Sequence, residues 1–252
     1  MHTLAHAQSM FRPLALTLTL ACAALFVGQA ASAQEAVIRK NIAERMPDFP
    51  KIEEVTKTPI PGLYELRVGT EVFYTDEQGN HLIEGQMIET KTRTNLTEAR
   101  IAKLSAIDFD QLPLKDALVW KNGTGARKMA VFADPNCGYC KRFEKDLQQV
   151  KDVTVYTFLY PILGGDSPEK SRDIWCSKDK AKVWLDWMLR SVAPVRSMGE
   201  CDASALQRNA ALGRKHRVNG TPAIVFEDGK RVPGAMNLEQ IEKQLAASRA
   251  KS

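Results

Sequence analysis

The sequence predicts a mixed α+β protein in which a small antiparallel sheet precedes a larger part built on a strand–helix–strand unit. Between residues 64 and 84 apolar and polar side chains alternate, as in half-buried strands. Further along, continuous apolar runs at 129–132 and 153–158 are typical of buried strands. The amphipathic segment between these two runs begins at Cys137 and Cys140, so the cysteine pair lies at the centre of the predicted unit.

The cysteine pair reads Cys137-Gly138-Tyr139-Cys140 and directly follows the first buried strand. This places Cys137 at a helix N-terminus, where free backbone N–H groups and the helix dipole favour the thiolate. Two intervening residues let Cys140 close a disulfide onto Cys137. The pair is therefore interpreted as a redox switch.

Two other roles are known for such a pair, a zinc site and a structural disulfide. A zinc site needs four ligands, and beyond the first few residues the remaining candidates are isolated: Cys176, Cys201, His81 and His216. A purely structural disulfide of so short a span would restrain little of the unfolded chain. Neither alternative explains the pair as well as redox chemistry does.

Composition sets the broad class. The chain has 252 residues, of which 44% are hydrophobic and 26% charged, which is ordinary for a globular protein. The net charge is +5, but Lys and Arg are dispersed along the sequence. Nothing in this pattern indicates a nucleic-acid partner.

Residues 1–33 are predicted to be a cleaved signal peptide. Arg12 precedes an apolar run from Leu14 to Val27, and Ala31-Ser32-Ala33 has the small-x-small pattern of a cleavage site. The run is too short for a membrane span. A lipoprotein signal at Cys22 is the alternative, but Thr19 stands where Leu is usual. Export matters because disulfides persist outside the cytosol.

Two further cysteines, Cys176 and Cys201, are predicted to form a structural disulfide. If Cys137 and Cys140 pair with each other, these two remain as partners, and they enclose a helical segment with Trp184 and Trp187. Loop-closure entropy for such a segment corresponds to about 3–4 kcal/mol. The alternative, two buried free thiols, fits an exported protein less well.

The first part of the mature chain, residues 34–94, is predicted to start with a helix from Gln34 to Met46, ended by Pro47. Ile38, Ile42 and Met46 would share one helix face. Strands are expected at 64–68, 72–75 and 81–84, and this small sheet has little core of its own. We therefore expect it to bury surface against a second copy, giving a homodimer.

A helix capped by Asn95 and running to about Ile107 is predicted next, within a linker spanning residues 95–112. After the strand–helix–strand unit the sequence predicts a long helical stretch from about 168 to 214. A strand over 220–226, a second strand around 231–232 and a closing helix with Leu238, Ile241 and Leu245 complete residues 113–252. Pro222 then stands near a strand start, where proline costs no ladder hydrogen bond.

This order of elements resembles the thioredoxin fold, and the details resemble the DsbC and DsbG family of periplasmic disulfide isomerases. The residues that carry the resemblance are Phe132-Ala133-Asp134, Cys137-Gly138-Tyr139-Cys140, Ile174-Trp175-Cys176-Ser177-Lys178-Asp179-Lys180, Ser191-Val192-Ala193-Pro194, Gly220-Thr221-Pro222-Ala223 and, in the N-terminal sheet, Tyr74-Thr75-Asp76 with Gly79. The cysteines are similar to those of the DsbC branch, whereas Phe132-Ala133-Asp134-Pro135 is closer to the DsbG branch. The cysteines weigh more because they bear on the chemistry.

The resemblance implies a dimerisation domain over 34–94 and a catalytic domain with a helical insertion over 113–252. It also implies a cis Thr221–Pro222 bond beside the active site, with the Thr221 backbone free to pair with a substrate strand. A trans proline at a strand start is the alternative. Thioredoxins and DsbA-like oxidases carry a buried acid where this chain has Val131, so that proton relay is missing. Asp134 is expected to serve as a turn or capping residue.

The expected activity is isomerisation and reduction of incorrect disulfides in exported proteins, without metal or organic cofactor. Cys137 would attack the client disulfide and Cys140 would release stalled intermediates, with Gly138 and Tyr139 as the active-site dipeptide. The family resemblance implies a periplasmic location and a DsbD-type membrane reductase as electron donor. An exported thiol oxidase and a dimeric holdase chaperone are the alternatives, and chaperone activity can coexist with isomerisation.

Overall fold

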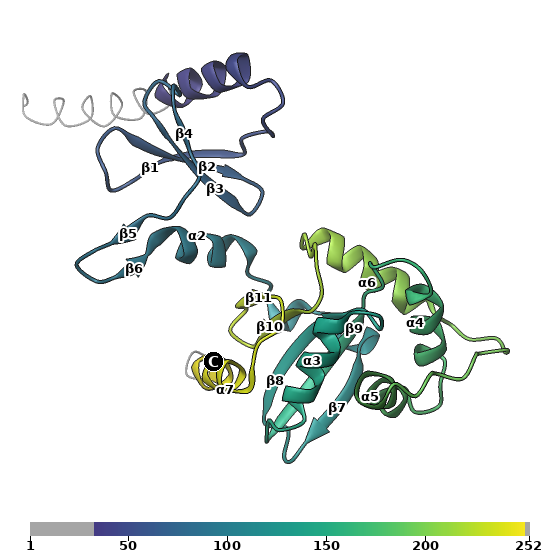
Figure 1. Ribbon diagram of the computed structural model, residues 1–252. Helices are drawn as coiled ribbons and strands as arrows, with labels where there is room; N and C mark the ends of the chain where they lie inside the picture. Colours follow the sequence, from purple (N-terminus) through teal and green to yellow (C-terminus); the bar gives the residue numbers. More distant parts are fainter. Residues whose placement is uncertain (1–32, 250–252) are drawn as a thin grey trace, which may run out of the picture. The chain divides into compact units, whose positions relative to one another are not determined.

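The computed structural model describes residues 33–249, so the predicted leader lies outside the described residues except for Ala33. The described residues form two compact units that divide between Ile101 and Ala102 (Figure 1). The division falls inside helix α2 (Leu96–Ser105). Each unit has its own sheet and its own buried core.

The smaller unit is a helix over residues 33–45 followed by an antiparallel sheet in the order β1-β2-β3-β4. The strands are β1 (Glu54–Lys57), β2 (Leu63–Val68), β3 (Glu71–Asp76) and β4 (Leu82–Ile83). A hairpin of β5 (Ile88–Glu89) and β6 (Thr94–Asn95) follows. The predicted small antiparallel sheet is confirmed, and β1 is an additional edge strand that the sequence pattern did not reveal.

The core of the smaller unit joins the helix to the sheet. Ile38 and Ile42 are buried against Tyr64 and Leu66 of β2. Met46 was expected on the same face, but it lies beyond the helix end and is 44% exposed. The reason is local, since the proline at 47 disfavours helical backbone at the residue before it.

Helix α2 begins as predicted. The backbone N–H of Glu98 donates to the Asn95 side-chain oxygen at 3.0 Å, which confirms Asn95 as the N-cap. Arg100 then forms ion pairs with Glu65 and Glu54 of the sheet, each at 2.8 Å. The helix ends at Ser105, and two short turns follow, η1 (Phe109–Gln111) and η2 (Leu114–Asp116).

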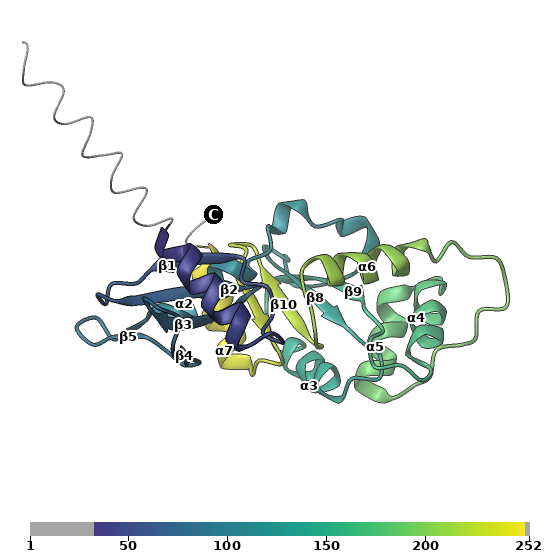
Figure 2. The ribbon, with the colours of Figure 1, turned by 90° about the horizontal axis from the view of Figure 1, so that it is seen from above.

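The larger unit has a five-stranded sheet in the order β11-β10-β8-β9-β7. Its strands are β7 (Leu118–Asn122), β8 (Arg127–Ala133), β9 (Val153–Leu159), β10 (Ala223–Phe226) and β11 (Arg231–Pro233). Only β8 and β9 pair in parallel, and they are joined by helix α3 (Gly138–Leu147). Figures 1 and 2 show α3 lying along this central pair, as the predicted strand–helix–strand unit requires.

Side chains of β8 alternate between two cores, one on each face of the sheet. Met129 and Val131 pack with α3 and with α7 (Leu238–Arg249), whereas Ala130 and Phe132 pack with residues of η1 and with Val218. Both faces are therefore buried. This explains why 129–132 is apolar throughout and shows no alternation in the sequence.

The predicted long helical stretch is wrong in detail, because it divides into three helices. These are α4 (Ser167–Trp175), α5 (Lys180–Arg190) and α6 (Ser204–Lys215). Asp179 caps α5 by accepting from the Lys182 N–H at 3.0 Å, and Ser191 ends it with a positive φ of 57°. Residues 191–203, with Pro194, form no helix.

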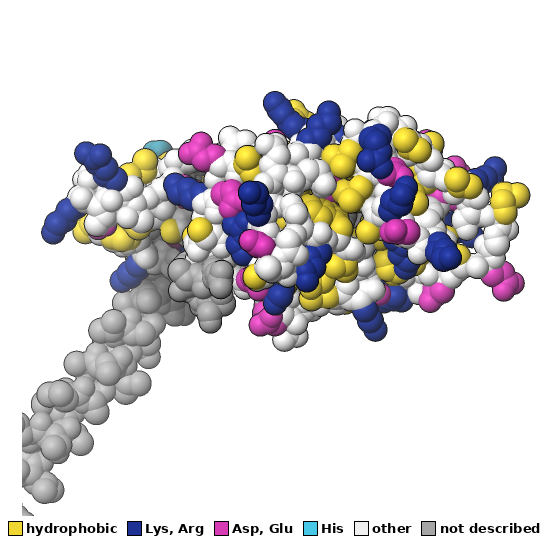
Figure 3. Space-filling view, turned by 90° about the horizontal axis from the view of Figure 1, so that it is seen from below, with side chains coloured by type: hydrophobic (Ala, Val, Ile, Leu, Met, Phe, Trp, Pro, Cys, Tyr) yellow, Lys and Arg dark blue, Asp and Glu magenta, His cyan; other side chains and the backbone are white. Residues whose placement is uncertain are grey.

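The surface carries mixed charge. Figure 3 shows Lys and Arg side chains dispersed among acidic and apolar ones on the face in view, without one continuous basic area. Within residues 33–249 no helix combines the length and the apolar character needed to cross a membrane.

Candidate active site

Within residues 33–249 two cysteines are free, Cys137 and Cys140, and they lie at the start of α3, directly after β8. Cys137 is the N-cap, and its sulfur accepts the Cys140 backbone N–H at 3.3 Å. Both thiols are buried; Cys137 is only 5% exposed and Cys140 lies inside the main core. The predicted position of Cys137 at a helix N-terminus is confirmed.

The surroundings of the two thiols shift their pKa values in opposite directions. A hydrogen bond from the Cys140 thiol is the largest influence that lowers the pKa of Cys137, to about 5, against the opposing effect of burial. The Thr221 side chain and the N–H groups of Cys140 and Tyr139 add to the lowering. Burial, followed by the neighbouring Cys137, raises the pKa of Cys140 far above its usual range. One sulfur is thus a thiolate at neutral pH and the other is a thiol.

The Thr221–Pro222 segment lies against this pair. The peptide bond between these residues is cis, and the Thr221 carbonyl oxygen lies 3.2 Å from the Cys137 sulfur, which donates a hydrogen bond to it when protonated. The chain then continues into β10, where Ala223 pairs with Phe132 of β8. The neighbouring strand therefore positions Thr221 beside Cys137.

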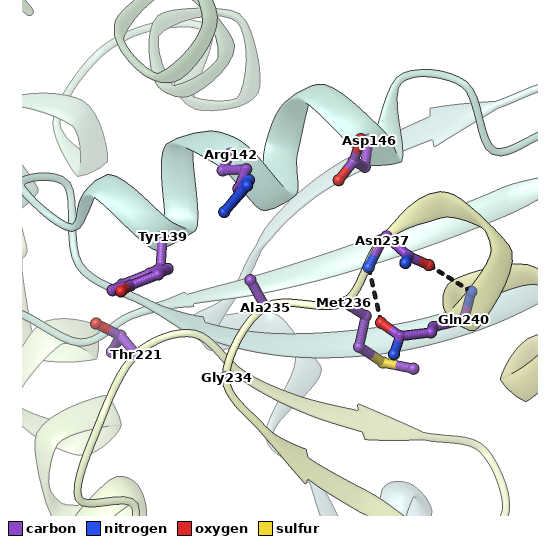
Figure 4. A pocket seen from close by; sticks show the side chains of 9 residues that line it. All are labelled: Tyr139, Arg142, Asp146, Thr221, Gly234, Ala235, Met236, Asn237 and Gln240. Carbon is purple, nitrogen blue, oxygen red and sulfur yellow. Dashed lines mark hydrogen bonds between the residues drawn. The ribbon is translucent and has the colours of Figure 1, made fainter.

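A pocket of about 450 Å³ opens beside the cysteines (Figure 4). Tyr139 and Arg142 line it from α3, while Thr221 and residues 234–236 line it from the opposite loops. Tyr139 is 66% exposed and forms part of the pocket rim. Ala235 and Met236 give the pocket an apolar wall.

Figure 4 also shows how the far end of this pocket is closed. The Asn237 N–H donates to Gln240 Oε1 at 3.0 Å, and the Gln240 N–H donates to Asn237 Oδ1 at 2.9 Å. This reciprocal capping box fixes the start of α7. The side-chain oxygens of Asn237 and Gln240 are thereby engaged with the backbone of the far wall.

Asp134 has the turn role expected from the sequence. Its carboxylate is fully buried and accepts three hydrogen bonds, from the Asn136 N–H at 2.8 Å, the Ser167 hydroxyl at 2.7 Å and the Leu163 N–H at 2.9 Å. Both oxygens are thus engaged in holding the loops around the active site.

The helical insertion supports the loop just before Cys137, through a contact that the sequence reasoning missed. The Trp187 indole N–H donates to the Pro135 carbonyl oxygen at 2.6 Å. Lys141 lies 4.0 Å from the centre of the Trp187 ring, and Lys170 lies 4.7 Å from it. Lys170 also donates to the Asn136 side chain at 3.0 Å. Trp187 stands out in the sequence only as one of several aromatic residues in a helical pattern.

Cys176 and Cys201 lie apart from this site and are joined by a disulfide with a Cα–Cα distance of 5.8 Å. Cys176 caps the end of α4, and Cys201 lies shortly before α6. The bond therefore closes the irregular segment after α5. In the described part of the chain no three His, Cys, Asp or Glu side chains are grouped as a metal site would need.

The structure thus brings together six residues singled out in the sequence: Cys137, Gly138, Tyr139, Cys140, Thr221 and Pro222. It adds one group that sequence reasoning did not find. Glu144, one helical turn after Cys140, is 3% exposed and has a carboxylate oxygen with no hydrogen-bond partner in the described structure. Its only sequence signal is its place on the apolar face of α3.

Comparison with known families matches both parts of the chain. Residues 29–98 match the disulfide bond isomerase protein N-terminal domain, and residues 114–249 match the thioredoxin-like domain. A crystal structure of a disulfide interchange protein from Neisseria gonorrhoeae is similar with a TM-score of 0.51 at 36% identity, covering 54% of this chain and 98% of that chain. The predicted fold class, a thioredoxin-like domain preceded by a small antiparallel sheet, is confirmed.

Full-length relatives are similar as well. The probable thiol:disulfide interchange protein DsbC of Bordetella parapertussis is 46% identical over 217 residues, which cover 86% of this chain and 76% of the relative. The thiol:disulfide interchange protein DsbC of Escherichia coli is 30% identical over 212 residues, covering 81% and 84%. With two matching domains and these identities, the chain belongs to the DsbC family of thiol:disulfide interchange proteins.

Proposed function

We propose that this chain isomerises and reduces incorrect disulfides in exported proteins, with Cys137 as the attacking thiolate and Cys140 as the resolving thiol. The observation that carries the proposal is the difference between the two sulfurs. Cys137 has a pKa of about 5, and Cys140 is held protonated beside it. A low-pKa thiolate at a helix N-terminus next to a buried partner is suited to attack a disulfide and then be released.

The first step joins enzyme and client. The Cys137 thiolate attacks one sulfur of a client disulfide, forming the mixed disulfide and expelling the other client sulfur as a thiolate. That thiolate can attack a different client disulfide, and the resulting client thiolate returns to displace Cys137. Client bonds are then rearranged with no net change in oxidation state.

The second route is reductive. If rearrangement stalls, Cys140 attacks Cys137, the Cys137–Cys140 disulfide forms, and the client leaves with both cysteines reduced. Two electrons have passed from the enzyme to the client. A DsbD-type membrane reductase is proposed to return them in the periplasm, where the Cys176–Cys201 disulfide would also persist.

The pocket beside Cys137 is proposed to hold the client. An extended client segment would lie between Tyr139 and the Thr221 loop, with its backbone against Thr221. The apolar part of the pocket suits unfolded chains of many sequences. Residues 34–94 are proposed to form a homodimer, so that two such sites serve one client; chaperone activity would then be an addition to isomerisation.

Single-cysteine variants test the assignment of roles. Cys137→Ser is expected to abolish reduction and isomerisation, whereas Cys140→Ser should accumulate mixed disulfides and keep part of the isomerisation of a scrambled client. Non-reducing gels and a refolding assay measure both. Mixed disulfides trapped by Cys137→Ser but not by Cys140→Ser would reverse the roles, and full isomerisation without either cysteine would leave only a holdase.

The redox state of the Cys137–Cys140 pair in the exporting cell separates an isomerase from an oxidase. A mostly reduced pair supports the proposal, and a mostly oxidised pair supports the oxidase.

A further inference from the structure

The release step of this chemistry needs a base that the described active site does not obviously supply. Burial raises the pKa of the Cys140 thiol, so Cys140 must lose its proton before it can attack the mixed disulfide. Val131 occupies the strand position at which thioredoxins and DsbA-like oxidases carry a buried acid, and Asp134 has both oxygens engaged in hydrogen bonds from the surrounding loops. Neither residue is a free proton acceptor.

Glu144 lies on the same helix, one turn beyond Cys140. Both side chains belong to the buried side of α3, together with Phe143 and Leu147. Residues four apart on a helix have Cβ atoms about 5–6 Å from each other. A glutamate carboxyl extends two further carbons from its Cβ, a length comparable with that spacing.

The described surroundings of Glu144 offer its carboxylate two indole N–H groups and no opposite charge. Trp120 of β7 and Trp184 of α5 are the side chains that act on it, and no charged group is among the causes that shift its titration. Its Oε1 atom has no hydrogen-bond partner within the described residues, and neither indole nitrogen has one of ordinary geometry. Buried polar groups are nearly always satisfied, so a buried carboxyl that meets only two poorly aligned indole N–H groups, one helical turn from Cys140, calls for an explanation.

Burial raises the pKa of Glu144 to about 7, while the two indoles act in the opposite direction. A carboxyl with this pKa changes its protonation state near neutral pH. That is the range in which a general base is most effective. This pKa therefore supports a role for Glu144 in proton transfer, which its position one helical turn from Cys140 already suggests.

We propose that Glu144 accepts the proton of the Cys140 thiol in the step that releases the client. This inference rests on the proposed function. The Cys140 S–H bond breaks and its proton passes to the Glu144 carboxylate, while the Cys140 sulfur bonds to Cys137. The bond between Cys137 and the client sulfur breaks, and the client leaves as a thiolate that takes a proton from water. When a dithiol reductant later reopens the Cys137–Cys140 bond, Glu144 returns its proton to the expelled Cys140 thiolate.

The test separates attack from release in the full-length protein. Reduced enzyme is mixed with an excess of a disulfide-linked peptide carrying a fluorophore and a quencher. Attack by Cys137 gives a phase whose rate depends on peptide concentration, and release by Cys140 gives a phase that does not. Both rates are measured from pH 5 to 9 for the parent protein, Glu144→Gln and Glu144→Asp. The control is Glu200→Gln, which changes an exposed glutamate in the same way.

Glu144→Gln is expected to slow release by about 100-fold at pH 7.5, the lower end of the usual size of a general-base effect, and to leave attack unchanged. The parent and Glu144→Asp should show release rising through an inflection near neutral pH, and the Gln variant should lack it. Glu200→Gln should match the parent. A release rate and pH profile in Glu144→Gln equal to those of the parent would overturn the role of Glu144. Absence of the attack phase in the parent protein would instead overturn the proposed function.

Discussion

The sulfur of Cys137 lies 3.2 Å from the carbonyl oxygen of Thr221, although 84 residues separate the two in the chain. The contact follows from the pairing of β8 and β10, in which Ala223 lies opposite Phe132. The strand that leads into the cysteine helix and the strand that follows Pro222 are neighbours. A reactive thiol and the backbone proposed to bind the client are therefore placed by the sheet itself.

The first prediction concerns the acidity of Cys137. Because hydrogen bonds lower its pKa to about 5, the rate of alkylation of the reduced protein should rise through pH 5 and become level above about pH 6.5. Stopped-flow alkylation with iodoacetamide measures this, and Cys137→Ser provides the blank. A midpoint near 8.5, the value of an ordinary cysteine, would contradict the proposed activation of the thiol.

Trp187 is predicted to stabilise the loop before Cys137 through its N–H group. Trp187→Phe keeps an aromatic ring for Lys141 but loses the hydrogen bond to Pro135, at an expected cost of about 1 kcal/mol in unfolding free energy. Trp187→Ala loses the ring as well and should cost about 3 kcal/mol. Urea unfolding at fixed redox conditions compares the two. No loss of stability in Trp187→Phe would show that the N–H group contributes nothing.

Glu144 should make stability depend on pH. Its pKa rises from 4.5 in the unfolded chain to about 7 in the folded protein, so the folded state binds this proton more tightly. The associated stability is complete below about pH 4.5 and is lost as the pH rises through 7, a difference of about 3 kcal/mol. Glu144→Gln removes this dependence.

Urea unfolding at pH 5 and pH 8 measures the effect. The stability of Glu144→Gln relative to the parent should increase from pH 5 to pH 8. Glu200→Gln, which alters an exposed residue, should give the same difference from the parent at both pH values. A constant offset for Glu144→Gln would mean that Glu144 titrates at its ordinary value in the folded protein.

The proposed dimer is tested with a fragment of residues 102–252. This starting point keeps Ile107 and Phe109, which are buried in the core of the larger unit. The fragment should be monomeric in sedimentation, should reduce small peptide disulfides at a rate close to that of the chain starting at Gln34, and should refold a scrambled client poorly. A dimeric fragment, or undiminished isomerisation by a monomer, would contradict the proposed dimerisation through residues 34–94.

The sequence correctly predicted the strands and helix ends that depend on residues close together in the chain. The apolar run at 129–132, the strand at 153–158 and the Asn95 cap are present because side-chain periodicity and capping act within a few residues. The edge strand β7 was missed, since its alternation of buried Leu118 and Trp120 with exposed Val119 spans only five residues. The breaks between α4, α5 and α6 were missed because the helical spacing of apolar residues continues across them. Asp179, which caps the start of α5, and Pro194, which follows its end, were the local signals of these breaks.

By itself the sequence determined the fold class, the family and the placement of Cys137 at a helix N-terminus, because each depends on residue order over short spans. Only the tertiary structure decided what surrounds that thiol. The Thr221 carbonyl, the Trp187 N–H that reaches Pro135, and the indoles of Trp120 and Trp184 against Glu144 come from distant segments. The pKa values of Cys137 and Glu144 depend on the burial and the hydrogen-bonding groups that these distant segments supply. Local patterns along the chain do not show which distant segments will be in contact.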